Sequence, residues 1–249
     1  MPRNILSIAV LALSLLSAPL AHATDWGSVL QSAGDMARQA AGESTSSGLT
    51  TAEMVDGLKA ALKKGVGRAV EQLGAAGGFL DDPEVRIPLP ENLAKLGSAL
   101  RMAGMGDRVD AFEASMNHAA ERAVPAGRDV FLKAISSMSV SDAADILNGP
   151  DDAATRYFEE ATRSELFGIF EPIVSEQTDA VGVTAKYKSM EQSAAAVAPM
   201  LGMDAPDLDA YVTDGALDGL FTVLAEEEKR IRTDPAARTT ELLKKVFGD

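Results

Sequence analysis

Apolar residues recur along most of this 249-residue chain with the spacing of an α-helix, and this periodicity constrains the fold more than any other feature. The clearest stripe follows Thr50, which can form a capping box with Glu53 three residues later. The apolar members of the stripe are Met54, Leu58, Ala61, Leu62, Val66, Ala69, Val70 and Leu73. Alternating runs typical of strands are scarce, and aromatic residues make up only 5% of the chain. The pattern predicts an all-α protein.

Short connections between the predicted helices indicate that residues 50–249 form one compact bundle of about eight to nine helices. The helices after the first are expected at Glu91–Ala103, Asp107–Val124, Pro125–Ser137, Ser139–Asn148, from about Asp151 onward, Thr184–Ala198, Asp207–Arg232 and Ala236–Phe247. Because proline lacks a backbone N–H, we expect Pro172 to kink or end the helix that begins near Asp151.

The segment Gly74–Pro90, which we call the strap, interrupts the helical pattern with three glycines and three prolines. Val85, Ile87 and Leu89 occupy alternate positions near its end, and the prolines exclude a central strand. An extended strap could press these three apolar side chains onto the helices. Arg86 would then point along that surface or away from it.

The first 23 residues are typical of a cleavable secretory leader. A positively charged start precedes an apolar run over Ile5–Leu16, and Ala21 and Ala23 match the small residues of a signal-peptidase site. We therefore expect cleavage after Ala23 and a periplasmic protein without stable membrane insertion. Residues 24–49 are expected to form an amphipathic segment followed by a linker rich in Ser, Thr and Gly.

Composition excludes several classes of function. The chain carries 23 basic and 37 acidic residues, and its net charge of −14 repels nucleic acid and anionic lipid head groups. It has no cysteine, which excludes disulfides, thiol catalysis and cysteine-bound metals. His118 is the only histidine beyond the leader and is expected to be an exposed bystander. We therefore expect no metal site and no cofactor, and the sequence contains no P-loop or dinucleotide fingerprint.

Several blocks of the sequence resemble one family of exported proteobacterial proteins. The most distinctive block is FLDDPEVRIPLP at Phe79–Pro90. The other blocks are Met116–Glu121, Ser137–Ala143, Asp152–Phe158, Tyr211–Lys229 and Leu243–Phe247. The family is catalogued as domain of unknown function number 4197, and the resemblance spans roughly Thr50–Phe247. It implies a helical, exported, single-domain protein. It carries no known activity, so it transfers no functional residue to this chain.

Four glutamates fall on helix faces that are otherwise apolar. Glu113 and Glu165 lie within the apolar arcs of their helices, and Glu227 and Glu228 lie at the two margins of a third arc. A buried carboxylate needs a cationic partner or must stay protonated. Arg86 is the expected partner, because a guanidinium suits bidentate pairing with a carboxylate. We expect Arg86 to be substantially buried and within salt-bridge distance of one of these glutamates.

Two interpretations of this cluster remain open. Arg86 and the four glutamates could bind an anionic ligand in a groove that the strap covers, or an internal ion pair could pin the strap. The function we favour is that of a non-enzymatic periplasmic protein that binds an apolar or anionic ligand or a protein partner. It rests on the alanine-lined helices, the strap, and the methionines at positions 102, 105 and 116, since methionine adapts to varied ligands.

The alternative function is that of an acid–base hydrolase that acts on an envelope substrate through two interior carboxylates. The few aromatic residues argue against sugar stacking, and no paired-acid motif is present. An open groove of roughly a few hundred cubic ångströms lined by carboxylates would favour the hydrolase. A closed core or a purely apolar tunnel would favour the binding protein.

Overall fold

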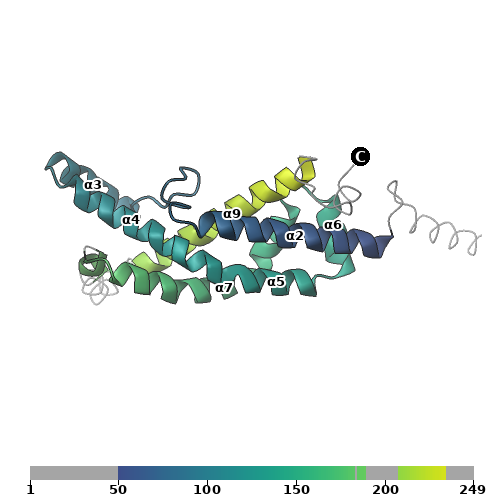
Figure 1. Ribbon diagram of the computed structural model, residues 1–249. Helices are drawn as coiled ribbons and strands as arrows, with labels where there is room; N and C mark the ends of the chain where they lie inside the picture. Colours follow the sequence, from purple (N-terminus) through teal and green to yellow (C-terminus); the bar gives the residue numbers. More distant parts are fainter. Residues whose placement is uncertain (1–49, 183, 189–206, 234–249) are drawn as a thin grey trace, which may run out of the picture. The chain divides into compact units, whose positions relative to one another are not determined.

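The computed structural model describes residues 50–182, 184–188 and 207–233. The chain divides into two compact units after Thr50, and the described helices belong to the second, Thr51–Asp249. The described residues contain α-helices and one short 3₁₀ helix but no strand, so the all-α prediction is confirmed. The elements in Figure 1 are α2 (Thr51–Leu73), α3 (Glu91–Met102), α4 (Gly106–Ala123), η1 (Val124–Gly127), α5 (Arg128–Ser137), α6 (Val140–Asn148), α7 (Ala153–Asp179) and α9 (Leu208–Thr233).

Several of the segments predicted from the sequence lie outside the described residues. They are the leader, residues 24–49, residues 189–198 of one expected helix and the helix expected at Ala236–Phe247. The seven described α-helices otherwise follow the expected order, although η1 forms a separate turn ahead of α5. In the part of the chain that the structure describes, no helix is both long enough and apolar enough to cross a bilayer.

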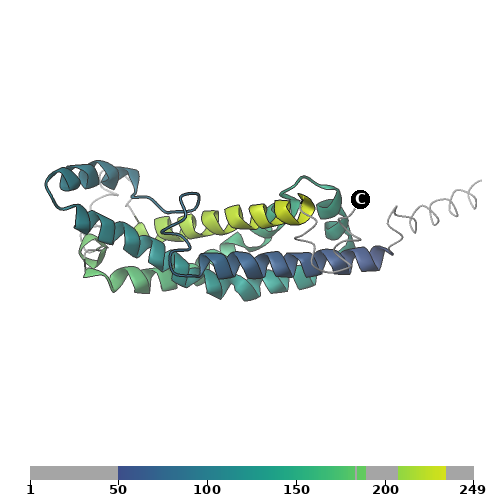
Figure 2. The same cartoon turned by 45° about the horizontal axis from the view of Figure 1, so that its top comes forward.

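A large hydrophobic core joins most of the described helices of this unit. Helix α9 packs against α2, α4 and α7, and Figure 2 shows α9 and α2 running side by side. The ring of Phe131 on α5 meets those of Phe158 on α7 and Phe221 on α9 edge-on, with centroids 5.6 and 6.1 Å apart. Because such rings prefer edge-to-face contacts, this trio fixes α5, α7 and α9 against one another.

Helix α7 continues through Pro172 to Asp179, so the helix does not end at this proline. Phe170 and Val174, on either side of it, are fully buried and hold the helix against the core. Pro172 itself is exposed, and so is Gly168. The carbonyl of Gly168 lacks its helical hydrogen bond, because Pro172 has no N–H to donate. Water can therefore replace the missing bond, and burial of the opposite face outweighs its loss.

The strap starts with turns and ends as an extended chain over residues 86–90 that lies against α4 and α9. Val85 and Ile87 are buried and Leu89 is half-buried against the core, so the expected inward alternation is confirmed. Two glycines of α9 allow this close approach. A Cβ atom at Gly219 would lie 2.6 Å from the ring of Phe79, and one at Gly215 would lie 3.1 Å from Ile87.

Candidate functional site

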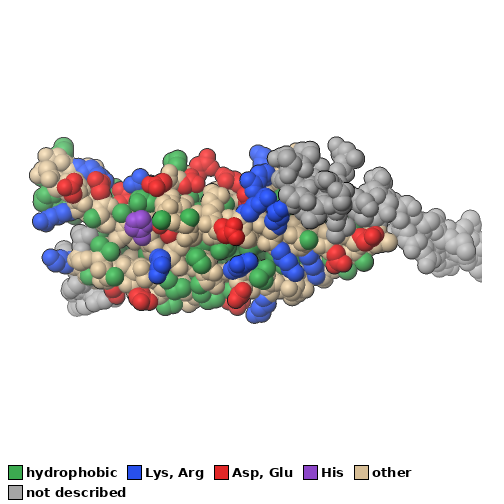
Figure 3. All heavy atoms as spheres, viewed as in Figure 1, with side chains coloured by type: hydrophobic (Ala, Val, Ile, Leu, Met, Phe, Trp, Pro, Cys, Tyr) green, Lys and Arg blue, Asp and Glu red, His purple; other side chains and the backbone are tan. Residues whose placement is uncertain are grey.

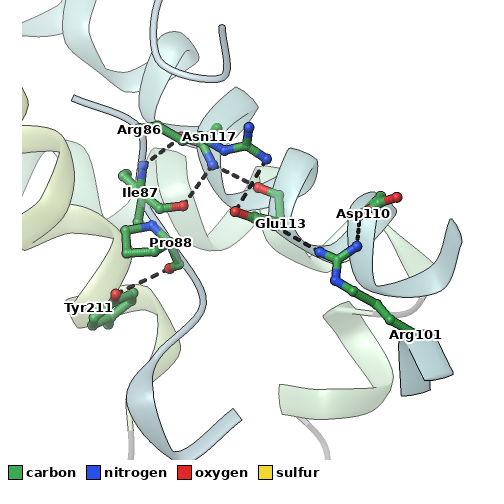
Figure 4. A network of polar contacts seen from close by, with 8 residues as sticks. All are labelled: Arg86, Ile87, Pro88, Arg101, Asp110, Glu113, Asn117 and Tyr211. Atoms are coloured by element: carbon green, nitrogen blue, oxygen red, sulfur yellow. Dashed lines mark hydrogen bonds and ion pairs between the residues drawn. The ribbon is translucent and has the colours of Figure 1, made fainter. Parts of the chain in front are cut away.

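A chain of ion pairs begins at Arg86, on the outer side of the strap (Figure 4). The Arg86 guanidinium lies 3.2 Å from Glu113 on α4, and Arg101 on α3 contacts the same carboxylate at 3.3 Å. Arg101 also pairs with Asp110, one turn before Glu113. The expected proximity of Arg86 to one of the four glutamates is therefore found, and the partner is Glu113.

The expected burial of Arg86 is wrong, because its side chain is 43% exposed. Val85 and Ile87 turn inward, so the alternation of the extended strap directs Arg86 outward. The side chain reaches Glu113 along the surface. Since Glu113 is only 13% exposed and also contacts Arg101, its charge does not depend on Arg86 alone.

The other three glutamates do not join Arg86. Glu165 is 50% exposed and lies 3.6 Å from Lys133, so its expected interior position is wrong. On α7 the buried positions are the neighbouring Thr162 and Leu166, and Glu165 falls just outside their arc. Small errors in helical phase accumulate over a helix as long as α7, which explains the misplacement.

Glu227 and Glu228 on α9 are both buried, and each serves a structural contact. Glu227 binds Arg230 at 2.5 Å and Arg68 of α2 at 3.5 Å. Glu228 accepts hydrogen bonds from the backbone N–H groups of Ala154 and Thr155, both at 2.9 Å. It thus caps the first turn of α7 from another helix, where a negative charge is stabilised by the helix dipole.

Arg232 completes the Glu228 site. Its guanidinium lies 2.9 Å from Glu228, four residues earlier, and donates to the carbonyl of Ile146 in the last turn of α6 at 2.7 Å. The cavities beside these side chains measure only about 20 and 10 Å³. They have room for about one water molecule, and a substrate does not fit.

Two further residues of α4 hold the strap, and the sequence analysis missed both. The amide of Asn117 accepts from the N–H of Ile87 at 2.8 Å and donates to its carbonyl at 2.9 Å. Glu121 accepts from the N–H groups of Phe79 and Leu80, both at 3.2 Å. Together with Glu113, these residues recur every fourth position along α4 and form a polar stripe beneath the strap. That spacing was the signal available in the sequence.

His118 is 54% exposed, as expected, but it is more than a bystander, because Nδ1 lies 2.9 Å from Glu121. Burial raises the pKa of the Glu121 carboxyl, yet the hydrogen bonds from His118, Leu80 and Phe79 outweigh burial and lower the pKa overall. Glu121 is therefore held as a carboxylate. Its geometry suits an anchor for the strap better than a general acid.

A pocket of about 250 Å³, which we call the pocket beneath α3, opens beyond the end of the strap and between α3 and α4. Its wall is formed by Leu89, Leu93, Leu96, Gly97, Leu100, Met105, Arg108, Val109, Phe112 and Tyr187. Gly97 lets α3 approach the strap, since a Cβ atom there would lie 2.8 Å from Leu89. The described wall of the pocket is therefore mostly apolar and carries one charged side chain, that of Arg108.

The part of the pocket wall formed by Tyr187 is held in place by contacts with neighbouring helices. The Tyr187 ring meets Phe112 edge-on at 5.4 Å between centroids, and the hydroxyls of Thr184 and Ser115 lie 2.7 Å apart. Lys188 is buried and pairs with Asp209 at 2.6 Å and Asp179 at 2.8 Å. These contacts fix residues 184–188 against α4, α7 and α9, so this side of the pocket is built into the fold.

A second groove, of about 300 Å³, runs between the strap and α9. It is lined by the carboxylates of Glu84, Asp214 and Asp218, together with Arg86, and by the ring of Tyr211, whose hydroxyl donates to the carbonyl of Pro88 at 3.1 Å. Arg163 of α7 binds Asp214 at 3.0 Å and Asp218 at 2.7 Å. The charged side chains that line this groove are mainly acidic, in contrast to those of the pocket beneath α3.

No group of three His, Asp or Glu side chains converges as metal ligands within the described residues. A family model described as "Protein of unknown function (DUF4197)" matches residues 48–248, which confirms the resemblance of the sequence blocks. Comparison with curated proteins and with solved structures finds no match.

Proposed function

This chain belongs to the DUF4197 family, whose description assigns no activity, and we propose that it is a non-enzymatic protein that binds an apolar ligand in the pocket beneath α3. The observation that carries this proposal is the 250 Å³ pocket with a wall of leucine, valine, methionine and aromatic side chains. A concave, mostly apolar site with few polar groups is the usual form of a small-molecule site.

The exposed apolar residues at the rim of the pocket indicate that a ligand can enter from solvent. Leu96 is 55% exposed and Met105 36% exposed, and both contribute to the pocket wall. Apolar side chains reach the surface at the α3 end of the unit, on the left in Figure 3. Exposed apolar area that adjoins a cavity favours a ligand, because binding removes that area from water.

A charge placed at the rim tests this proposal. We expect a neutral fluorescent probe, N-phenyl-1-naphthylamine, to bind the full chain, and Leu96→Asp to weaken binding at least about tenfold, since a carboxylate there must be desolvated. Val140→Asp is the matched control, because Val140 is 57% exposed on α6 and does not line the pocket. Equal binding by the parent and Leu96→Asp, or no binding by the parent, would overturn the proposal.

The acidic groove between the strap and α9 favours a second candidate, an acid–base hydrolase of envelope substrates. Burial raises the pKa of Glu226, and a hydrogen bond to Glu84, which lines the groove, raises it further. A raised carboxyl pKa beside a carboxylate is what a general acid requires. The Arg163 contacts to Asp214 and Asp218 count against this candidate, since both carboxylates are already occupied.

Turnover decides between the candidates. The hydrolase requires the parent chain to cleave glycan or peptide fragments of the cell envelope and Glu226→Gln to abolish that cleavage. The binding protein requires no cleavage by either chain. Cleavage that Glu226→Gln leaves unchanged would point to a contaminant and would remove the support for the hydrolase.

Periplasmic localisation is the third part of the proposal. It rests on the apolar run and the Ala21-His22-Ala23 site of the leader, which lie outside the described residues. We expect N-terminal sequencing of protein from the periplasmic fraction to begin at Thr24. Protein that keeps Met1 in a membrane fraction would overturn this part.

A further inference from the structure

We infer that the ligand of the pocket beneath α3 is a single-chain carboxylate, that is, one alkyl chain ending in a carboxylate that pairs with Arg108. This inference rests on the proposed apolar-ligand function and specifies its ligand. Among the described residues, Arg108 is the one charged residue of the pocket wall, and none of the described residues along that wall is acidic. An otherwise apolar wall with a single guanidinium matches a ligand with one apolar body and one anionic end.

Arg108 belongs to the pocket face of α4. Met105 is the N-cap of α4, Val109 lies four residues after it, and Phe112 lies four residues after Arg108. This spacing places all four residues on one helix face, and all four line the pocket. Arg108 is exposed, whereas Val109 and Phe112 are buried. The aliphatic stem of the arginine can therefore continue the apolar wall while its guanidinium reaches the rim.

The Arg108 charge is available to a ligand. Arg101, on the neighbouring helix, is already paired with Asp110 and Glu113. Arg108, by contrast, makes no ion pair with a carboxylate in the described part of the chain. The chain as a whole carries a net charge of −14, which repels anions, so the Arg108 guanidinium is the feature of the described pocket wall that favours an anion over a neutral ligand.

The pocket favours a free single chain over a membrane. A volume of about 250 Å³ is below the usual range for drug-sized ligands, and it suits one alkyl chain. An anionic bilayer would meet a protein of net charge −14 and be repelled. A carboxylate also matches the planar fork of the guanidinium, which can donate two parallel hydrogen bonds.

Displacement of N-phenyl-1-naphthylamine from the full chain tests the inference. We expect decanoate to displace the probe at a concentration about tenfold or more below that of 1-decanol, because only decanoate gains a charge-assisted pair with Arg108. In Arg108→Gln the two ligands should become equivalent while the probe still binds. Arg122→Gln is the control, since Arg122 is an exposed arginine of the same helix outside the pocket wall.

Each other outcome has a distinct meaning. Equal displacement by decanoate and 1-decanol from the parent chain overturns the inference and leaves the apolar-ligand function standing. A preference for decanoate that persists in Arg108→Gln also overturns it, because the charge would act elsewhere. Failure of the parent to bind the probe overturns both. Arg108-dependent co-sedimentation with phosphatidylglycerol vesicles would identify a membrane surface instead and overturn the assignment of a free ligand.

Discussion

The buried corner around Glu228 and the pocket beneath α3 both place charge next to apolar side chains, but they differ in what satisfies that charge. Glu228 accepts bonds from two backbone N–H groups and pairs with Arg232, and the adjacent cavities hold about 20 and 10 Å³. Arg108 makes no ion pair with a carboxylate of the described residues and borders about 250 Å³. The first arrangement stabilises the fold, and the second leaves capacity for a ligand.

The two regions also differ in how firmly their helices are held. Helix α7, which Glu228 caps, packs extensively against α4 and α9, whereas α3 packs chiefly against α4. Leu96 and Met102 of α3 are 55% and 84% exposed. Few buried contacts mean a low free energy of local opening, so the wall formed by α3 is the part of the pocket best able to adjust to a ligand.

The largest expected effect is at the buried corner. Glu228→Ala should lower the free energy of unfolding by about 3–5 kcal/mol, because it leaves the Arg232 charge and two N–H groups of α7 without their partner. Urea denaturation measures this loss. A loss below about 1 kcal/mol would mean that water replaces the carboxylate. The corner around Glu228 would then be open to solvent, and its contrast with the pocket beneath α3 would fail.

Next in size is the anchor of the strap. Asn117→Ala removes the partner of both the N–H and the carbonyl of buried Ile87, and should cost about 2–3 kcal/mol. Asn148→Ala is the control, since Asn148 is exposed and its amide donates to the carbonyl of Ala144 in the same helix, so it should change stability by less than about 0.5 kcal/mol. Equal effects would show that the strap is not held by Asn117.

Arg86→Ala should cost only about 1 kcal/mol or less, well below the 3–5 kcal/mol typical of a broken buried pair. The Arg86 side chain is 43% exposed, and Glu113 keeps its contact with Arg101. Thermal or urea denaturation of this variant beside Asn117→Ala compares the two attachments of the strap. A larger loss for Arg86→Ala than for Asn117→Ala would reverse their order.

Acid should weaken the contact between Glu121 and the strap, with a smaller effect on stability than the substitutions above. Because the folded pKa of Glu121 lies below its ordinary value of 4.5, its carboxylate contributes stability that is complete above pH 4.5 and is lost as the pH falls through the folded pKa. The stability difference between the parent and Glu121→Gln should therefore shrink below pH 4.5. A difference that is constant between pH 3 and pH 7, or that grows in acid, would contradict the lowered pKa.

The smallest effect on stability is expected at the pocket rim. Leu96→Asp should change the free energy of unfolding by no more than about 0.5 kcal/mol, because Leu96 is more than half exposed. The same change should reduce probe binding at least about tenfold. Loss of probe binding without loss of stability would show that Leu96 serves the ligand, whereas Glu228 serves the fold. A loss of several kcal/mol in the free energy of unfolding would instead mean that α3 belongs to the core.

Much of the architecture is local and follows from the sequence. Periodicity predicted the helices because one apolar face per helix must be buried, and alternation in the strap predicted that Val85 and Ile87 turn inward. Glu113 was expected as one of four partners of Arg86 for the same reason, since it lies on a buried face. Glu165 shows the limit of this prediction. On a long helix, the angular position calculated from the sequence is too imprecise to separate a buried residue from one at the margin of the buried face.

Tertiary structure decided what each face meets. Asn117 and Glu121 bind the strap, and Glu228 caps α7, because chain segments 30 to 74 residues apart in the sequence come together. The pocket beneath α3 likewise depends on where Tyr187 lies against Phe112 and on how closely α3 approaches Leu89. Periodicity specifies which side chains leave water, but the partners they meet and the space left between them are properties of packing between distant segments.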